Sequence, residues 1–386
     1  MTAQAAIQDT RLSLSGAHVC SIITSLTSGG AEILVTNLNT HFTRHDVVAT
    51  VTAFCDAPTL GNSAVMEAEL AGRLAQADCR FRSLSMKSKR GLLEGALALR
   101  RFLKDEEPDV IHVHTVRGVL MLALANCRAP IVFTHHNSRL SFPPSLFRLL
   151  DRIVECYVAI SAETAAVYRL HSRRPFVLIP NAPSPIFRVG APRTACAPRA
   201  RILAVGAISE QKNYPLLIET ARRMHDNASS GGPVPIFRIA GGGAGLAELR
   251  ERVGKLGLEE TVEFLGERSD IAALLADTDL YLNTSHYEGF SIAILEALSS
   301  AVPVVATDVP GNRGLVKTGQ NGLLAPIGRP AELAGAIRRI TSDAALYRQL
   351  SAGAMRSARD YTIEGAARRH LSLYASLLRR NEARKD

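Results

Sequence analysis

Short apolar runs alternate with amphipathic stretches along almost the whole chain. Seven runs in the first half and five in the second have the length of buried strands, for example HVCSIITSL at 18–26, PIVFTH at 130–135 and DLYLNTS at 279–285. Strands that alternate with helices form parallel sheets covered by helices on both faces. The sequence therefore predicts an α/β protein with doubly wound, Rossmann-like sheets.

A break in this alternation divides the chain. Residues 183–200 are rich in Pro, Ala and Arg and lack periodicity, so we interpret them as a linker. A length of 386 residues suits two domains or one large domain. We expect two doubly wound domains with an interdomain cleft, in which ligands bind beyond the carboxyl ends of the strands.

Composition argues against several other classes of protein. No apolar run reaches the roughly 20 residues that cross a bilayer. The N-terminal segment MTAQAAIQDTRLSLSG lacks the basic and apolar regions of a signal peptide. The six cysteines are scattered singly, without a C-x-x-C pair. This spacing favours reduced thiols in a cytoplasmic protein over a disulfide framework or a zinc site.

The net charge of +9 is concentrated in residues 73–104, which contain nine lysines and arginines against two acidic residues. Aromatic residues that could stack on bases are nearly absent there, so nucleic acid is not an expected partner. An anionic membrane surface or an anionic acceptor fits better, and a solvated basic face is the alternative. The segment LSFPPSLFRLL at 140–150 could also dock at a lipid interface, or it could pack as a helix in the first domain.

Two carboxylates follow one of the second-half strands. In ADTDLYLNTSHYEGFSIAILEAL (276–298), Glu288 lies in a turn after the strand and Glu296 lies inside the next helix. A helix N-terminus at this position suits a phosphate or sugar hydroxyls. The spacing alone is weak evidence for a site, because it recurs at Glu155/Glu163, Glu251/Glu259 and Glu259/Glu267. The strand–turn–helix context is what distinguishes Glu288 and Glu296.

Three other groups could contact a ligand. Gly29 and Gly30 precede a helix, where backbone can approach a ligand closely, although an ordinary turn would look the same. Lys212 precedes a helix and could stabilise a diphosphate leaving group, or it could be an ordinary exposed lysine. His136 follows a central strand and could face a ligand, or it could be a core or capping histidine. Without a third ligand at a suitable spacing, we do not expect a metal site there.

Two further patterns resemble binding motifs, but their context does not support them. AGGGAG at 240–245 is not the G-x-G-x-x-G of a dinucleotide site. Asp277 and Asp279 form the D-x-D of metal-dependent glycosyltransferases, but they precede a strand and so lie at the wrong end of the sheet. We interpret them as residues that cap a helix end.

Taken in order, these segments resemble the family 4 retaining glycosyltransferases, which have the GT-B fold. The resemblance covers nearly the whole chain and rests mainly on SLTSGGAE, VFTHHN, ILAVGAISEQKNYPLLI and YLNTSHYEGFSIAILEALSSAVPVVATDVPGN. It implies an acceptor-side domain at 1–187, a linker at 188–200 and a nucleotide-sugar-binding domain at 201–361. A C-terminal helix at 362–386 would cross back to the first domain.

The resemblance also implies roles for individual residues. Glu288 would hold the donor sugar and Glu296 the ribose hydroxyls. His136 would lie by the donor sugar near the acceptor. The rest of the donor site would comprise Lys212, Gly29, Gly30, Asn181 and Gly206, together with the backbone of Gly289, Phe290 and Ser291.

The chain departs from the family at one position. The family usually has Gly-Arg where this chain has Gly206-Ala207, so one phosphate-binding cation is missing. Arg268 is a candidate replacement.

The resemblance implies an enzyme that moves a sugar from a nucleotide-sugar donor to a hydroxyl of a glycan or lipid-linked acceptor. The configuration would be retained by front-face attack, without a metal or other cofactor. Its place would be cell-envelope polysaccharide or glycolipid synthesis, such as lipopolysaccharide or exopolysaccharide, in the cytoplasm or at the inner face of the cell membrane. The alternatives are an epimerase-type GT-B enzyme and a non-catalytic GT-B-like binding subunit.

Overall fold

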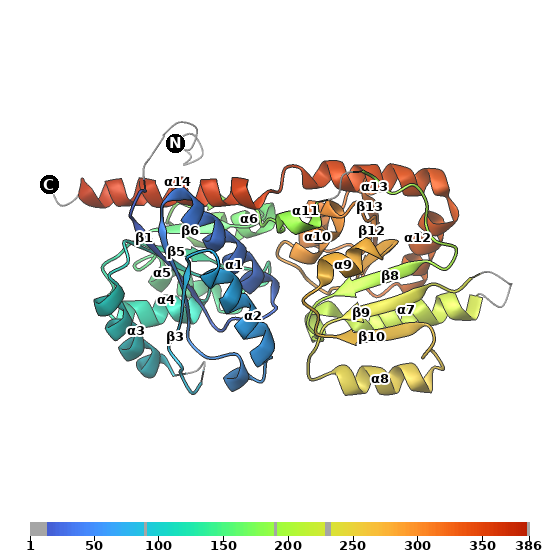
Figure 1. Ribbon diagram of the computed structural model, residues 1–386, viewed down its shortest axis with the longest axis horizontal. Helices are drawn as coiled ribbons and strands as arrows, with labels where there is room; N and C mark the ends of the chain where they lie inside the picture. The colour runs from blue at the N-terminus through green and yellow to red at the C-terminus, as the bar shows by residue number, and fades with distance from the viewer. Residues whose placement is uncertain (1–13, 89–90, 189–190, 228–232, 384–386) are drawn as a thin grey trace. The chain divides into compact units, whose positions relative to one another are not determined.

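A computed structural model describes residues 14–88, 91–188, 191–227 and 233–383. The chain divides into two compact units (Figure 1). One unit runs to Asn181 and takes up the chain again at Ile363, and the other is the continuous segment Ala182–Thr362. Each unit contains one parallel sheet with helices on both faces, which confirms the predicted doubly wound α/β class.

The first unit is built on a seven-stranded parallel sheet in the order β3-β2-β1-β4-β5-β6-β7. Its strands are β1 (His18–Ile23), β2 (Val48–Ala53), β3 (Arg80–Ser83), β4 (Val110–Val113), β5 (Ile131–Thr134), β6 (Cys156–Ala159) and β7 (Phe176–Leu178). Its helices are α1 (Gly30–Phe42), α2 (Ala64–Ala75), α3 (Leu92–Glu106), α4 (Val116–Leu124), α5 (Phe147–Leu150), α6 (Ala162–His171) and α14 (Ile363–Glu382). The strand order reverses between β1 and β4, the point at which such sheets bind ligands.

The second unit has a six-stranded parallel sheet in the order β10-β9-β8-β11-β12-β13. Its strands are β8 (Arg201–Val205), β9 (Ile236–Ala240), β10 (Val262–Gly266), β11 (Leu280–Asn283), β12 (Val304–Thr307) and β13 (Gly322–Ala325). Its helices are α7 (Tyr214–Asn227), α8 (Leu246–Lys255), α9 (Ile271–Ala276), α10 (Ile292–Ser299), α11 (Pro310–Leu315), α12 (Pro330–Ser342) and α13 (Ala344–Ala358). The sequence analysis did not predict strand β13, because its four residues follow a turn and are not part of a longer apolar run.

Burial explains why most strands could be recognised. Strands β1, β4, β5, β6, β11 and β12 are buried at every position. A strand covered by helices on both faces reads as a continuous apolar run rather than as an alternating one. Within the part of the chain that the structure describes, no helix is long and apolar enough to cross a membrane.

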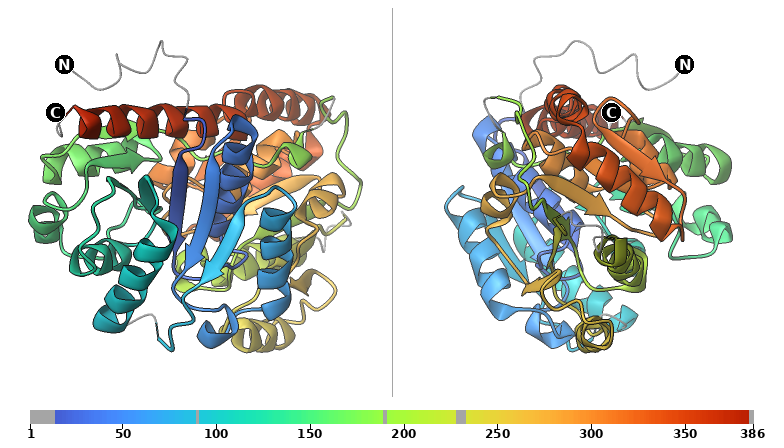
Figure 2. Two further views of the ribbon diagram at one scale, coloured as in Figure 1. Left: turned by 60° about the vertical axis from the view of Figure 1, so that its left-hand side comes forward. Right: turned by 90° about the vertical axis from the view of Figure 1, so that its right-hand side faces the viewer.

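Helix α14 completes the first unit, although it lies at the far end of the sequence. It packs against α1, as two views show (Figures 1 and 2). Its buried face includes His370 and Tyr374. The Tyr374 hydroxyl lies 2.7 Å from Nδ1 of His112 on the central strand β4. The helix is therefore joined to the sheet by a polar contact as well as by apolar packing.

The predicted linker comprises residues 188–200, of which 189 and 190 lie outside the described residues. Its described part has no regular structure and belongs to the second unit. The Arg193 guanidinium donates to the backbone carbonyls of Leu275, Ala276 and Ser300 at the ends of α9 and α10. A cation at these carbonyls satisfies acceptors that have no partner within the helices.

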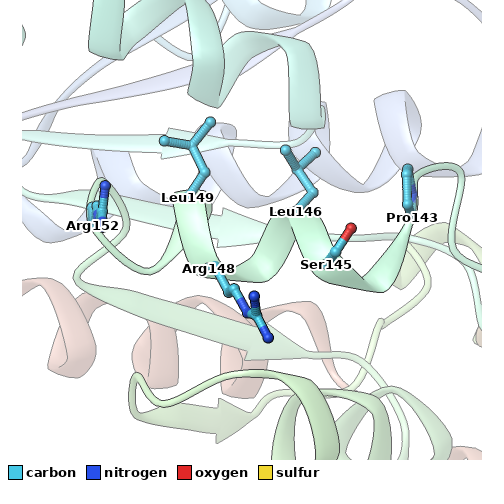
Figure 3. A pocket seen from close by; sticks show the side chains of 6 residues that line it. All are labelled: Pro143, Ser145, Leu146, Arg148, Leu149 and Arg152. Carbon is cyan, nitrogen blue, oxygen red and sulfur yellow. The ribbon is translucent and has the colours of Figure 1, made fainter.

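Of the two interpretations of residues 140–150, packing within the first unit describes most of the side chains. Phe142, Phe147 and Leu150 belong to the core of the first unit. Between Pro143 and Arg152 the segment instead borders a shallow hollow of about 310 Å³ (Figure 3). Only Leu149 among the large apolar residues of the segment is exposed. The apolar pattern of 140–150 is explained mainly by packing.

Two helical glycines of the second unit give a matched test of this packing. A Cβ on Gly353 of α13 would overlap the Gln320 carbonyl oxygen, whereas one on Gly335 of α12 would meet open space. Alanine favours a helix over glycine by about 1 kcal/mol. Gly335→Ala should therefore leave the free energy of unfolding unchanged or raise it, and Gly353→Ala should lower it by roughly 1–3 kcal/mol through overpacking. Urea unfolding of both variants measures the difference, and equal effects would contradict the packing of α13.

Candidate functional site

The second unit brings Glu288 and Lys212 together at the carboxyl ends of β11 and β8. Oε1 of Glu288 accepts hydrogen bonds from Lys212 Nζ at 2.7 Å, Ser285 Oγ at 2.7 Å and Asn283 Nδ2 at 3.3 Å. The carboxylate is only 5% exposed. All three donors bind Oε1, and Oε2 has no partner among the described residues. One carboxylate oxygen thus anchors the site, and the other is free for a ligand.

The loops that carry this ion pair are bonded to each other through their backbones. His286 N donates to the Gln211 carbonyl at 2.8 Å, and Gln211 Nε2 donates to the Tyr287 carbonyl at 3.1 Å. The Thr284 hydroxyl donates to the Lys212 carbonyl at 2.9 Å. The positions of the cation and the carboxylate are therefore fixed independently of their own contact.

Buried polar side chains behind Glu288 escaped the sequence analysis. Asn283 ends the apolar strand β11, and its Oδ1 accepts from Asn312 Nδ2 at 3.1 Å. Asn312 Nδ2 also donates to the Thr307 carbonyl at 2.9 Å, and Thr307 Oγ1 donates to the Ser285 carbonyl at 2.6 Å. An asparagine at the end of a buried strand, in LYLN, is the signal that could have identified this network.

Glu296 lies on α10 and is 7% exposed. Its side chain has no hydrogen-bond or ion-pair partner among the described residues, and burial raises its pKa to about 8. The helix begins after Ser291, whose hydroxyl caps it by accepting from Ile294 N. Phe290, also buried, packs on Tyr361 with the ring centroids 5.4 Å apart. A buried carboxyl without a partner is costly unless a ligand satisfies it.

Gly206 leaves room for the lysine side chain. Its φ of +149° is one that other residues rarely adopt, and a Cβ there would lie 2.8 Å from Lys212 Cε. Neighbouring Ala207 is exposed. The AGGGAG segment, for which no role was predicted, supports this loop: Ile208 N donates to the Gly242 carbonyl at 2.8 Å. Its glycines are explained by close backbone packing.

The remaining charged residues considered from the sequence have partners of their own. Arg268 binds both carboxylate oxygens of Asp270, at 2.8 and 2.6 Å, so its charge is already compensated. Asp277 pairs with Arg201 and Arg238, and Asp279 accepts from the backbone of Arg201 and Ala197. Both aspartates precede β11 and thus lie at its amino end, as predicted.

In the first unit, His136 follows β5 and contacts another histidine. Its Nε2 lies 2.8 Å from Nδ1 of His114, which follows the neighbouring strand β4. The two rings are stacked, with centroids 5.0 Å apart. Burial lowers the pKa of His136 to about 3 and that of His114 well below its usual value, so both rings are neutral at neutral pH. Nδ1 of His136 is buried and has no hydrogen-bond partner among the described residues.

Gly29 and Gly30 stand at the start of α1, beyond the end of β1. Gly29 precedes the helix with extended backbone and no side-chain cap. A Cβ on Gly29 would overlap the Glu32 carboxylate. Burial raises the pKa of Glu32 to about 7. Asn181 is buried three residues after β7.

The predicted site residues thus fall into two groups. Lys212, Gly206, Glu296 and the segment from Glu288 to Ser291 belong to the second unit, where contacts join Lys212 to Glu288. Gly29, Gly30, His136 and Asn181 belong to the first unit.

Comparison with known families agrees with this arrangement. Residues 28–183 match the family Glycosyltransferase Family 4, and residues 197–356 match Glycosyl transferases group 1. The two matches fall on the first and second units and together span most of the chain.

Similar proteins belong to the same class. The lipopolysaccharide core biosynthesis mannosyltransferase LpsB of Rhizobium meliloti is 27% identical over 279 residues, which are 69% of this chain and 78% of that protein. A D-inositol 3-phosphate glycosyltransferase of Thermobispora bispora is 29% identical over 322 residues, 75% of each.

Solved structures share the fold. Anabaena Alr3699/HepE in complex with UDP and glucose has a TM-score of 0.76 at 21% identity and covers 93% of this chain and 100% of its own. Sucrose-phosphate synthase of Thermosynechococcus elongatus has a TM-score of 0.78 at 18% identity and covers 94% of this chain and 99% of its own. Because both family models match and the architecture is shared with these structures, the chain belongs to the group 1, family 4 glycosyltransferases and has the GT-B fold.

Proposed function

We propose that this glycosyltransferase moves a sugar from a nucleotide-sugar donor to a hydroxyl of a glycan or lipid-linked acceptor in cell-envelope polysaccharide or glycolipid synthesis. The observation that carries the donor assignment is the unpartnered, buried carboxyl of Glu296 in the same unit as the Lys212–Glu288 pair. Ribose hydroxyls would donate to Glu296, and a sugar hydroxyl would donate to the free Oε2 of Glu288. LpsB, named as a lipopolysaccharide core enzyme, supports the acceptor class.

The reaction would retain the anomeric configuration. The bond between the anomeric carbon and the diphosphate oxygen breaks, and the acceptor oxygen attacks the same face. The acceptor proton passes to the departing phosphate oxygen. Lys212 would stabilise the charge that develops on the diphosphate. We propose no metal for this step, and the arginine partners of Asp277 and Asp279 support that view.

A screen of nucleotide sugars tests the donor class. HepE was solved with UDP and glucose, so UDP-sugars are the first choice, followed by GDP-, ADP- and dTDP-sugars. A ligand at 100 times its Kd stabilises a protein by about 2.7 kcal/mol. Formation of a glycosylated product only when an acceptor is added would separate transfer from the epimerase and binding-subunit alternatives. Isomerised donor in the absence of an acceptor would favour the epimerase.

Substitution of each residue of the ion pair tests the reaction centre. Lys212→Met should cost about 2–4 kcal/mol in kcat/KM, because it removes the cation that stabilises the leaving group. Glu288→Gln should lower mainly kcat, because Glu288 contacts the reacting sugar. The two losses should not add, because the side chains bind each other. Lys255→Met on α8, where Lys255 pairs with Glu251, is the matched control; wild-type kinetics for Lys212→Met would refute the role.

The raised pKa of Glu296 predicts a conflict between stability and binding. Between its ordinary pKa of 4.5 and its folded pKa of about 8, the unfolded chain loses a proton that the folded protein keeps. The wild type should therefore lose stability as the pH rises through this range. Glu296→Gln should remove that loss, so its advantage in melting temperature should grow from pH 5 to pH 8. The thermal shift produced by the donor nucleotide should shrink in the same variant.

A pH-independent difference in melting temperature would show that Glu296 is not buried as a neutral acid. An undiminished nucleotide shift would instead refute its role in ribose binding.

We propose in addition that the first unit contacts an anionic membrane through α3. Of the basic residues in 73–104, Lys89 and Arg90 lie outside the described residues, and Arg80 and Arg82 pair with Glu106. Of the other five, Arg73 lies on α2 and donates to Asn37, and Lys87 is exposed. Arg100, Arg101 and Lys104 are exposed on α3, which also carries Glu94, Asp105 and Glu106, and the three form no ion pair with another described residue.

Exposed leucines lie on the same face of α3. Leu93 is 73% exposed and Leu97 is 60% exposed. Their spacing from Arg100, Arg101 and Lys104 follows the helical repeat, so all five side chains share one surface. A helix with apolar and basic residues on one exposed surface suits an anionic lipid interface. The candidate membrane surface is therefore α3 rather than residues 140–150.

Vesicle binding tests this surface. The protein should sediment with vesicles of phosphatidylglycerol and phosphatidylcholine at low salt and be released as salt rises, because screening weakens the attraction. A Leu93→Ser, Leu97→Ser variant should bind less. Leu170→Ser, which changes a leucine of α6 that is 76% exposed, should bind like the wild type. Equal losses in both variants, or no sedimentation of the wild type, would contradict the proposal.

A further inference from the structure

The contact between His114 and His136 has a consequence for the chemistry of the first unit. We propose that His114 is a positioning residue that determines which ring nitrogen of His136 carries the proton, and thereby whether His136 donates to or accepts from a ligand hydroxyl. The ligand's identity as a donor sugar rests on the proposed function. The coupling between the two rings rests on the geometry of the first unit alone.

The number of protons on the two rings limits the contact between them. Both rings are neutral at neutral pH, because burial lowers both pKa values. A neutral imidazole has one N–H and one nitrogen lone pair. The 2.8 Å contact between His114 Nδ1 and His136 Nε2 therefore needs a proton on one of these two nitrogens and a lone pair on the other.

The state of one ring then determines the state of the other. If His114 Nδ1 donates, the single proton of His136 lies on its Nδ1, which can donate to a ligand. If His136 Nε2 donates, Nδ1 of His136 carries a lone pair and can only accept a hydrogen bond. The tautomer of His114 is thus coupled to the hydrogen-bond direction of His136 Nδ1, an atom that it does not touch.

That atom is the one that requires a partner. His136 Nδ1 is buried without a hydrogen bond to any described residue. Leaving a buried polar nitrogen without a hydrogen bond is unfavourable. A ligand hydroxyl would remove this cost, but only in an orientation that matches the proton on His136.

The surroundings of His114 hold its ring in place. The ring packs on His112 with centroids 4.2 Å apart. His112 is bonded at both nitrogens, to Tyr374 of α14 and Thr134 of β5, each at 2.7 Å. His370, also on α14, lies 5.4 Å from His112. A column of imidazoles fixed from two strands and a helix gives His114 little freedom to turn away from His136.

Substitutions at His114 separate this role from simple packing. His114→Leu keeps an apolar side chain but removes the hydrogen bond. His114→Asn keeps a polar group near the position of Nδ1, and His114→Gln moves it toward Nε2. We expect Asn to support His136 better than Gln or Leu. His18→Leu, which removes a buried imidazole bonded to Glu106 and Thr50, is the control for general loss of packing.

The first readout is spectroscopic. Nitrogen-15 chemical shifts of labelled His136 report which ring nitrogen carries the proton. The wild type should show one dominant tautomer. His114→Leu and His114→Gln should give a mixture or the opposite tautomer, whereas His114→Asn and His18→Leu should retain the wild-type pattern. An unchanged His136 tautomer in both His114→Leu and His114→Gln would overturn the proposal.

The second readout is kinetic and uses the donor found in the nucleotide-sugar screen. His114→Leu should lower kcat by up to about 100-fold, as a misplaced reacting group does, without changing the donor KM. His114→Asn should recover most of this loss. Equal kcat in the Leu and Asn variants would overturn the catalytic consequence. If the protein transfers no sugar, the proposed function fails, and the tautomer measurement alone decides the coupling of the two histidines.

Discussion

The ion pair between Lys212 and Glu288 is the interaction on which the second unit's site depends. Adjacent parallel strands end at the same edge of a sheet, so the loops after β8 and β11 meet there. The charges are mostly buried, and a buried pair is tolerated only when further hydrogen bonds satisfy it. Asn283 and Ser285 supply those bonds, and Asn312 holds Asn283. A network of neutral side chains thus keeps a cation and an anion in place where a ligand carrying both phosphate and hydroxyls can bind.

The two candidate carboxylates of this unit, Glu288 and Glu296, have different hydrogen-bond environments. Glu288 has three donors on one oxygen and faces a lysine. Glu296, on the helix that follows, is buried without a donor among the described residues, and this burial raises its pKa. The second unit therefore contains one buried acid, Glu296, without a hydrogen-bond partner among the described residues, and one, Glu288, that accepts three hydrogen bonds. An enzyme that binds hydroxyl groups tolerates such an arrangement, since the ligand supplies the missing donors.

Much of the fold and part of the site could be predicted from the sequence. Buried parallel strands are continuous apolar runs, and Glu288, Lys212 and His136 all follow such runs. Predictions failed where a residue's role depends on contacts distant in the sequence. Asn283 and Asn312 were not identified because their hydrogen-bond partners come from other loops. For residues 140–150 the sequence left lipid docking and packing open, and the structure places Phe142 and Phe147 in the core. The partner of His136 was hidden because His114 follows a different strand, and only the order of the strands in the sheet brings the two together.

The position of α14 has a consequence for the order in which the protein can be assembled. The second unit is continuous from Ala182 to Thr362, so a ribosome releases all of it before the last helix. Most of the first unit is synthesised earlier, but it lacks α14 until the second unit has been translated, and until then His112 has no Tyr374 to bond. The unit that is made first is therefore completed last. The surface around His112 that α14 later covers stays exposed to water and chaperones while the second unit folds.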